Sequence, residues 1–103
     1  MECCLVFVTA KDEEEGEKIK DALIREKLAA CVKSAPVNST YTWKGKVEKS
    51  DEVLLIIETK TPLLEKIFKR IKSLHSYGVP AISAVPLIKG NKEYLKWINE
   101  VTE

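Results

Sequence analysis

The sequence predicts one α+β domain spanning residues 1–103, a sandwich of one β-sheet with helices packed on one face. Two apolar runs rich in β-branched residues, 3–9 and 53–57, are typical of buried strands. Two segments with apolar residues at helical spacing, 12–28 and 61–74, are typical of helices that cover a sheet. A chain of 103 residues, 45% hydrophobic and 32% charged, suits a soluble domain with a single core.

The first half of the chain predicts a strand, a helix and a long β-hairpin. Asp12 is placed to cap a helix that runs to about Leu28, with Glu15 three residues further on, as in a capping box. From Cys31 the chain is expected to be extended, with alternate residues up to Trp43 on one face. Residues 44–45, Lys-Gly, predict a tight turn because glycine adopts a positive φ without strain, and the return strand follows it.

The second half predicts a helix, a strand and a last helix. Thr61 is expected to be an N-cap with Pro62 in the first helical position, and the apolar face of this helix comprises Leu64, Ile67, Phe68, Ile71 and Leu74. Residues 79–88 predict a strand. Asn91 predicts the cap of a C-terminal helix whose apolar stripe is Tyr94, Trp97, Ile98 and Val101. The order βαββαβ with an added helix is the ferredoxin-like pattern, with an extended hairpin.

The strands carry more apolar residues than one chain of this kind can bury. Its two main helices cover one face of the sheet, so the strands should alternate between apolar and polar residues. The runs Leu5-Val-Phe-Val8 and Val53-Leu-Leu-Ile-Ile57 are instead apolar on both faces. An uncovered apolar face of that size is typical of an interface, and the sequence therefore predicts an oligomer.

Four segments in a fixed order carry a resemblance to a known family. They are Lys27-Leu-Ala-Ala-Cys31, Tyr41-Thr-Trp-Lys-Gly45, His75-Ser-Tyr-Gly-Val-Pro80 and Tyr94-Leu-Lys-Trp-Ile98. Together they resemble the CutA family, small trimeric proteins named for divalent-cation tolerance, over nearly the whole chain. The resemblance implies a homotrimer in which the sheets face inward and the hairpins reach across to adjacent subunits.

The resemblance also implies candidate metal ligands. Copper-binding proposals for the family involve a cysteine before the Thr-Ala pair of the first strand and two histidines at the end of the second main helix. Here those positions hold Val8, Leu74 and His75, so only the second histidine is kept. Cys31 matches a family residue. His75 and Cys31 are therefore the candidate ligands for copper(II) or another divalent cation, with no cofactor required. From the residues alone, a capping or surface role for His75 is the commoner one.

The resemblance further implies a cleft between subunits where a small ligand or metal ion would bind. Tyr41, Trp43 and Glu48 of the hairpin and Tyr77 fit the family's cleft residues. Many relatives have a lysine where this chain has Glu58, so we expect the cleft to favour cations. The alternative, which is favoured for Trp43 and left open for Tyr77, is that these aromatic residues only hold subunits together.

Other classes of function are disfavoured. The net charge of +1 gives no bulk attraction to nucleic acid or membranes. The basic residues Lys66, Lys69, Arg70 and Lys72 lie in one predicted helix, but no strand carries the aromatic motif on which RNA bases stack. No nucleophile–base pair or phosphate loop predicts an enzyme. No apolar segment predicts a membrane span, and the three cysteines lack a disulfide or chelate spacing, so we expect a cytoplasmic protein.

Two classes of function therefore remain. The first is a trimeric CutA-like protein that acts in divalent-cation tolerance, with weak copper(II) binding at intersubunit clefts. The alternative is a trimeric small-ligand signalling or scaffold protein like the PII regulators, which share this subunit topology. A structural trimer whose clefts bind nothing also remains open.

Overall fold

The computed structural model, which describes residues 2–103, has one four-stranded sheet, two helices packed on one face of it and a third helix at one end. Its elements are β1 (Cys3–Ala10), α1 (Glu13–Arg25), β2 (Cys31–Trp43), β3 (Lys46–Lys60), a 3-10 turn (Thr61–Leu63), α2 (Leu64–Leu74), β4 (Ile82–Pro86) and α3 (Lys92–Val101). The strand order is β2-β3-β1-β4, and all neighbours are antiparallel. This arrangement confirms the predicted ferredoxin-like fold.

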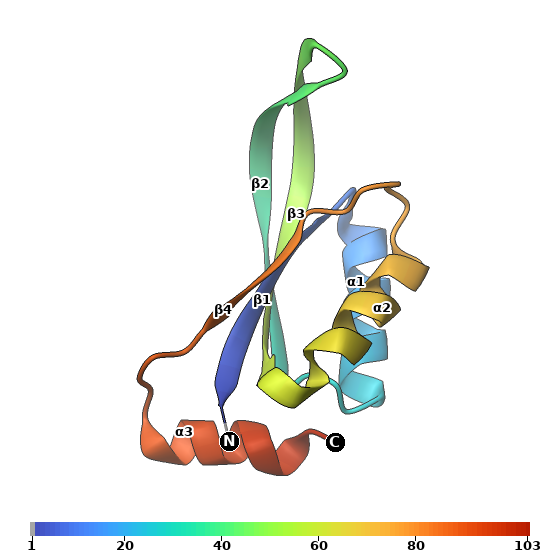
Figure 1. Cartoon of the computed structure of the whole chain (residues 1–103). Coiled ribbons are helices and arrows are strands. Elements are labelled where there is room, and N and C mark those ends of the chain that lie inside the picture. The colour runs from blue at the N-terminus through green and yellow to red at the C-terminus, as the bar shows by residue number, and fades with distance from the viewer. Residues whose placement is uncertain (1) are drawn as a thin grey trace.

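The core lies between the sheet and the helices α1 and α2, which pack on the same face (Figure 1). Alternate residues of β1 and β3 point into it, because successive side chains of a strand leave opposite faces. Val6 lies opposite Ile57 and Val8 opposite Leu55, and all four are at most 1% exposed. The helices contribute Ile19, Leu23, Ile67 and Ile71, which are fully buried.

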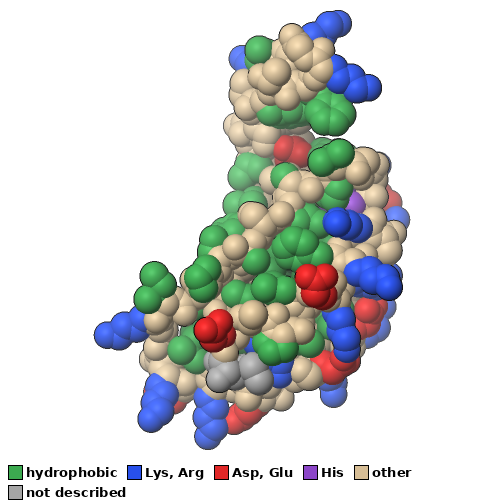
Figure 2. All heavy atoms as spheres, viewed as in Figure 1, with side chains coloured by type: hydrophobic (Ala, Val, Ile, Leu, Met, Phe, Trp, Pro, Cys, Tyr) green, Lys and Arg blue, Asp and Glu red, His purple; other side chains and the backbone are tan. Residues whose placement is uncertain are grey.

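The opposite face of the sheet, here called the open face, is covered within the chain only at one end, where α3 packs on it and buries Cys3, Glu58 and Lys60. It carries Leu5, Phe7, Leu54 and Ile56, which are only partly buried although all four are large and apolar. Figure 2 shows hydrophobic side chains gathered over the strands between the hairpin and α3. The excess of apolar residues predicted from the sequence therefore lies on this face.

The hairpin of β2 and β3 extends well beyond the rest of the molecule (Figure 1). Together they measure 45 Å along the longest axis. Pairing is continuous from Cys31 opposite Glu58 to Trp43 opposite Lys46. Lys44 and Gly45 have φ angles of 50° and 78°, so the predicted turn is confirmed and both of its residues are left-handed.

The first helix ends earlier than predicted, at Arg25 rather than near Leu28. Lys27 adopts a φ of 58°, and the N–H of Leu28 donates to the carbonyl of Leu23 over 2.9 Å. This is a Schellman motif with lysine in the position that glycine usually takes, so the sequence contained no stop signal. Glu103 then donates its N–H to the carbonyl of Lys27, which packs the end of the chain against this turn.

Two further boundaries differ from prediction. Thr61 is not an N-cap: it starts a 3-10 turn that precedes α2, and the extended residue before that turn is Lys60. The strand predicted over 79–88 spans only Ile82–Pro86, since the preceding residues form a loop. The caps at Asp12 and Asn91 are confirmed, because their side chains accept the N–H groups of Glu15 and Glu93. None of the helices formed by residues 2–103 is long and apolar enough to cross a membrane.

Two glycine-to-alanine substitutions should change stability in opposite directions. A Cβ on Gly16, inside α1, would meet Val53 and Leu55 at 3.5 and 3.6 Å, which are ordinary contacts. Gly16→Ala should therefore raise the free energy of unfolding by about 0.5–1 kcal/mol. A Cβ on Gly45 would meet no other atom, but alanine would have to adopt a φ of 78°. Gly45→Ala should therefore lower the free energy of unfolding by about 1–2 kcal/mol. Urea unfolding at equal protein concentrations measures both, and a loss in Gly16→Ala would show that α1 cannot accept the methyl group.

Candidate functional site

The predicted cleft residues of β2 and β3 all lie on the open face, but not at one place. Tyr41 pairs with Glu48 near the hairpin tip, and Trp43, half exposed, lies still closer to the turn. Glu58 lies ten residues further along β3, about 33 Å away at the rise of a strand. The structure therefore brings Tyr41, Trp43 and Glu48 to one end and leaves Glu58 at the other.

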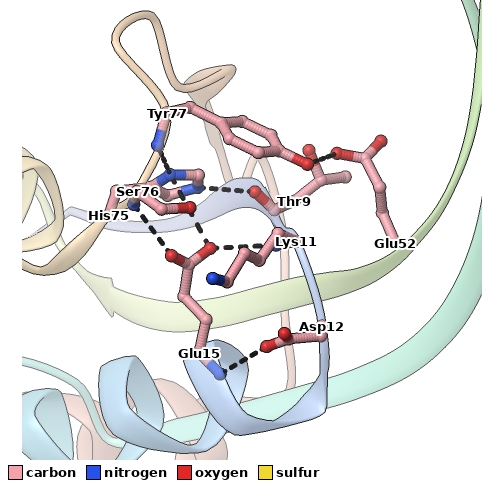
Figure 3. A network of polar contacts seen from close by, with 8 residues as sticks. All are labelled: Thr9, Lys11, Asp12, Glu15, Glu52, His75, Ser76 and Tyr77. Carbon is pink, nitrogen blue, oxygen red and sulfur yellow. Dashed lines mark hydrogen bonds and ion pairs between the residues drawn. The ribbon is translucent and has the colours of Figure 1, made fainter.

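At the hairpin end, the His75 side chain is completely buried and both of its ring nitrogens are used (Figure 3). Nε2 lies 2.7 Å from the carbonyl oxygen of Thr9, which can only accept, so Nε2 carries a proton. Nδ1 accepts the N–H of Tyr77 over 3.1 Å. These two hydrogen bonds fit the tautomer with its proton on Nε2, in which the lone pair of Nδ1 is already used within this subunit and is not free for a metal ion. The role of His75 in the fold is to tie the loop after α2 to β1.

Glu15 holds the same loop from the other side (Figure 3). One carboxylate oxygen accepts the N–H of Ser76 over 2.8 Å, and the other accepts the N–H of Lys11 over 2.9 Å. Burial would raise the pKa of Glu15, but these hydrogen bonds outweigh it, and the pKa lies below its usual value. The capping-box pattern pointed to Glu15, but nothing local in the sequence indicated its contact with Ser76, 61 residues away.

Tyr77 reaches from this loop to β3 and meets a carboxylate that the sequence analysis missed. Its hydroxyl donates to Glu52 over 2.8 Å, and Glu52 is only 8% exposed. Burial and the neighbouring Glu52 carboxylate raise the pKa of Tyr77 well above its usual value. Glu52 is separated from Glu48 and Glu58 by even numbers of residues along β3, so all three side chains leave the same face of the strand. This spacing could have identified Glu52 from the sequence. We call Glu52, His75 and Tyr77, together with Tyr41, the hairpin-end cluster.

A second cluster surrounds Glu58 at the other end of the open face. Glu58 is 4% exposed and accepts hydrogen bonds from the ammonium of Lys33 and, over 2.6 Å, from the hydroxyl of Tyr94. Burial would raise the pKa of Glu58, but Lys33 and Tyr94 outweigh it and the pKa is lowered. Cys31, half buried, has its sulfur 3.6 Å from the Lys33 nitrogen. These four residues are the α3-end cluster.

The pairing with Lys33 changes what was expected of Glu58. A carboxylate at this position was predicted to make the cleft favour cations. The ammonium of Lys33, on the neighbouring strand, compensates that charge directly. Within one subunit, Glu58 is therefore half of an ion pair and does not present an unbalanced negative charge.

The two candidate metal ligands lie in different clusters. His75 is bonded to Thr9, which pairs with Leu54, whereas Cys31 pairs with Glu58. Four residues of β3 separate these positions, about 13 Å. Among residues 2–103, no three histidine, cysteine, aspartate or glutamate side chains lie close enough to hold a metal ion together.

Glu15→Gln should loosen the loop that carries His75 and Tyr77. An amide cannot accept from both N–H groups, so one is left without a partner, and we expect a loss of about 1–3 kcal/mol at pH 7. Because the pKa of Glu15 is lowered in the folded state, its stabilisation is present above pH ~4.5 and is lost as the pH falls through the lowered value. Urea unfolding at pH 7 and pH 3 measures this.

The matched control is Glu14→Gln, since Glu14 is exposed and makes only a 3.9 Å contact with Lys18. It should change stability by less than about 0.5 kcal/mol at either pH. If Glu15→Gln and Glu14→Gln behaved alike, the carboxylate of Glu15 would not be what holds the loop.

Comparison with known proteins identifies the family. Residues 4–101 match the model of the CutA1 divalent ion tolerance protein family. The chain is 43% identical over 99 residues to the divalent-cation tolerance protein CutA of Thermus thermophilus, covering 95% of this chain and 96% of that protein. The solved structure of CutA1 from Oryza sativa superposes with a TM-score of 0.97 at 39% identity, covering 100% of this chain and 95% of that one.

The Archaeoglobus fulgidus CutA structure superposes with a TM-score of 0.96 at 38% identity, covering 98% of this chain and 99% of that one. That protein is described as periplasmic, so the cytoplasmic location expected for this chain stays a prediction. The names of these relatives describe tolerance of cations rather than an enzymatic reaction. The match over nearly the whole length, in sequence and in structure, means that this chain belongs to the CutA1 divalent ion tolerance family.

Proposed function

We propose that this chain forms a homotrimer that acts in divalent-cation tolerance and binds copper(II) weakly in clefts shared between subunits. Membership of the family supports the tolerance role. The proposed homotrimer is supported by the open face, where large apolar side chains of β1 and β3 lack a covering layer. Such a face is stabilised by burial against other copies of the chain.

Assembly would also complete the cleft. The hairpin-end and α3-end clusters lie at opposite ends of one rigid sheet, so they cannot meet within a subunit. The hairpin projects beyond the body of the molecule, which allows it to reach a neighbour (Figure 1). A cleft built from the hairpin-end cluster of one subunit and the α3-end cluster of the next would combine Tyr41, Glu52 and Tyr77 with Glu58, and Trp43 and Glu48 would lie further along the same hairpin.

Copper binding in such a cleft should be weak. His75 must give up the hydrogen bond from Tyr77 before Nδ1 can bind a metal ion. The Cys31 sulfur is more accessible, but it lies beside the Lys33 ammonium, which repels a cation. Both features reduce the affinity for copper(II).

Copper(II) titration of the purified protein by calorimetry tests the metal role. We expect saturable binding at one ion or fewer per subunit, and at least a tenfold loss of affinity in His75→Ala and in Cys31→Ser. Lys49→Ala, on the exposed hairpin, is the control and should bind like the wild type. Equal weak binding in all four proteins would mean that neither residue is a ligand and that metal tolerance is indirect.

A charge on the open face should break the assembly. Ile56→Asp places a carboxylate among Phe7 and Leu54, and sedimentation equilibrium should then give the mass of the single chain, 11.6 kDa. Wild type should give three times that mass. Ile24→Asp is the control, because Ile24 is an exposed isoleucine that lies on α1 and not on the open face. A trimer that persists in Ile56→Asp would place the interface elsewhere.

The second candidate function is small-ligand signalling or scaffolding by the same trimer. It is favoured by the finding that residues 2–103 contain no preassembled group of three metal ligands. This candidate predicts that nucleotides or small metabolites raise the melting temperature whereas copper(II) does not. A shift with copper(II) that vanishes in His75→Ala would exclude it.

A further inference from the structure

A groove of about 600 Å³ lies on the helical side of the molecule, away from both clusters of the open face. It is formed by the end of α1, one side of α2 and the last residue of the chain. Its lining includes three basic side chains of α2, two carboxylates, Leu28 and Ser73. Its volume falls in the range of small-molecule sites in proteins, about 300–1,000 Å³.

The three basic residues lie on one side of α2. Lys69 and Arg70 follow Lys66 by three and four residues, which places all three on the same side of α2. The aliphatic stems of such residues line apolar surface while their charged ends stay in water. Among the side chains that line the groove, the three cations outnumber the two carboxylates by one.

The groove already binds carboxylates from its own chain. Arg70 contacts Glu26 through Nε and Nη2 at 2.9–3.1 Å and also donates to Ser73. Lys66 contacts Glu103 at 2.7 Å. Among residues 2–103, no carboxylate lies within 4 Å of the Lys69 ammonium.

The two internal ion pairs differ in how easily they can be replaced. Arg70 and Glu26 are joined by several contacts of fixed geometry, which favours their persistence. Lys66 and Glu103 share a single contact, and both side chains are more than half exposed. Exposed pairs of this kind contribute little to stability, so an external anion can displace Glu103.

We propose that this groove binds a small organic dianion, with one carboxylate or phosphate on Lys66 in place of Glu103 and the other on Lys69. The Cβ atoms of the two lysines, three residues apart on α2, are about 5–6 Å from each other, so both ammonium groups can reach one small ligand. Leu28 and the stems of the basic side chains contact the apolar body of the ligand. Glu103 acts as an internal competitor for the site.

This binding does not depend on the trimer or on metal. Neither cluster of the open face lines the groove, so His75→Ala and Cys31→Ser should leave it unchanged. Titrations in EDTA remove any metal that a ligand might carry with it. Failure of the copper experiments and failure of this one are therefore independent results.

The experiment is an NMR titration of the full chain at 50 mM salt with two probes. Isophthalate carries two carboxylates on an apolar ring, and pyrophosphate carries phosphate charges without one. Saturable shifts at the amides of residues 66–73 and 103 are expected with isophthalate. A stronger response to pyrophosphate would assign the site to phosphate ligands, and a stronger response to isophthalate to carboxylates.

Three variants make the result specific. Lys69→Gln should weaken binding about tenfold, because a charge-assisted contact is lost. Glu103→Gln should strengthen it about two- to fivefold, because the competing carboxylate is gone. Lys18→Gln, an exposed lysine of α1, should change nothing. The proposal is overturned if Lys69→Gln binds like the wild type, if Glu103→Gln binds no more tightly, or if the shifts map to the open face.

Discussion

The alternation of side chains along β3 is the constraint on which the rest of the structure depends. β3 lies between β1 and β2 and pairs with both, so its register determines the register of the central sheet. Leu55 and Ile57 enter the core, while Leu54 and Ile56 face the opposite way. A slip of one residue would exchange the two sets and would place the Glu58 carboxylate in the core, where nothing could balance it.

Buried carboxylates connect the peripheral elements to this sheet. A buried charge is tolerated only when it is paired or hydrogen-bonded, so each such group selects the position of its partners. Glu15 and Glu52 together determine where the loop of residues 75–81 lies, through Ser76 and Tyr77. Glu58 does the same for α3 through Tyr94. The candidate functional residues are therefore also the residues that hold the loop and the last helix in place.

The sequence predicted the fold well because the fold follows from local patterns. Strand alternation, the caps at Asp12 and Asn91 and the Lys-Gly turn are all encoded within a few residues. The end of α1 was misplaced because Lys27 adopts a conformation that usually requires glycine. The polar contacts of the site were the least predictable. His75 was expected to cap the second main helix or to lie at the surface. It is the C-cap residue of α2, but its side chain is buried, and that burial depends on Thr9, 66 residues away in sequence. The partnership of Lys33 with Glu58 depends in the same way on strand register.

The location of the two clusters bears on where the function resides. Glu52 and Glu58 are six residues apart on one strand, about 20 Å, and a paired strand cannot shorten. Polar groups of the hairpin-end cluster and the Cys31 thiol can therefore act on one ligand only if they come from different subunits. The apolar surface between the clusters, Leu54 and Ile56 with Phe7, is the part of the chain that association would bury. Assembly and ligand binding would then use the same face, so a change in one would alter the other.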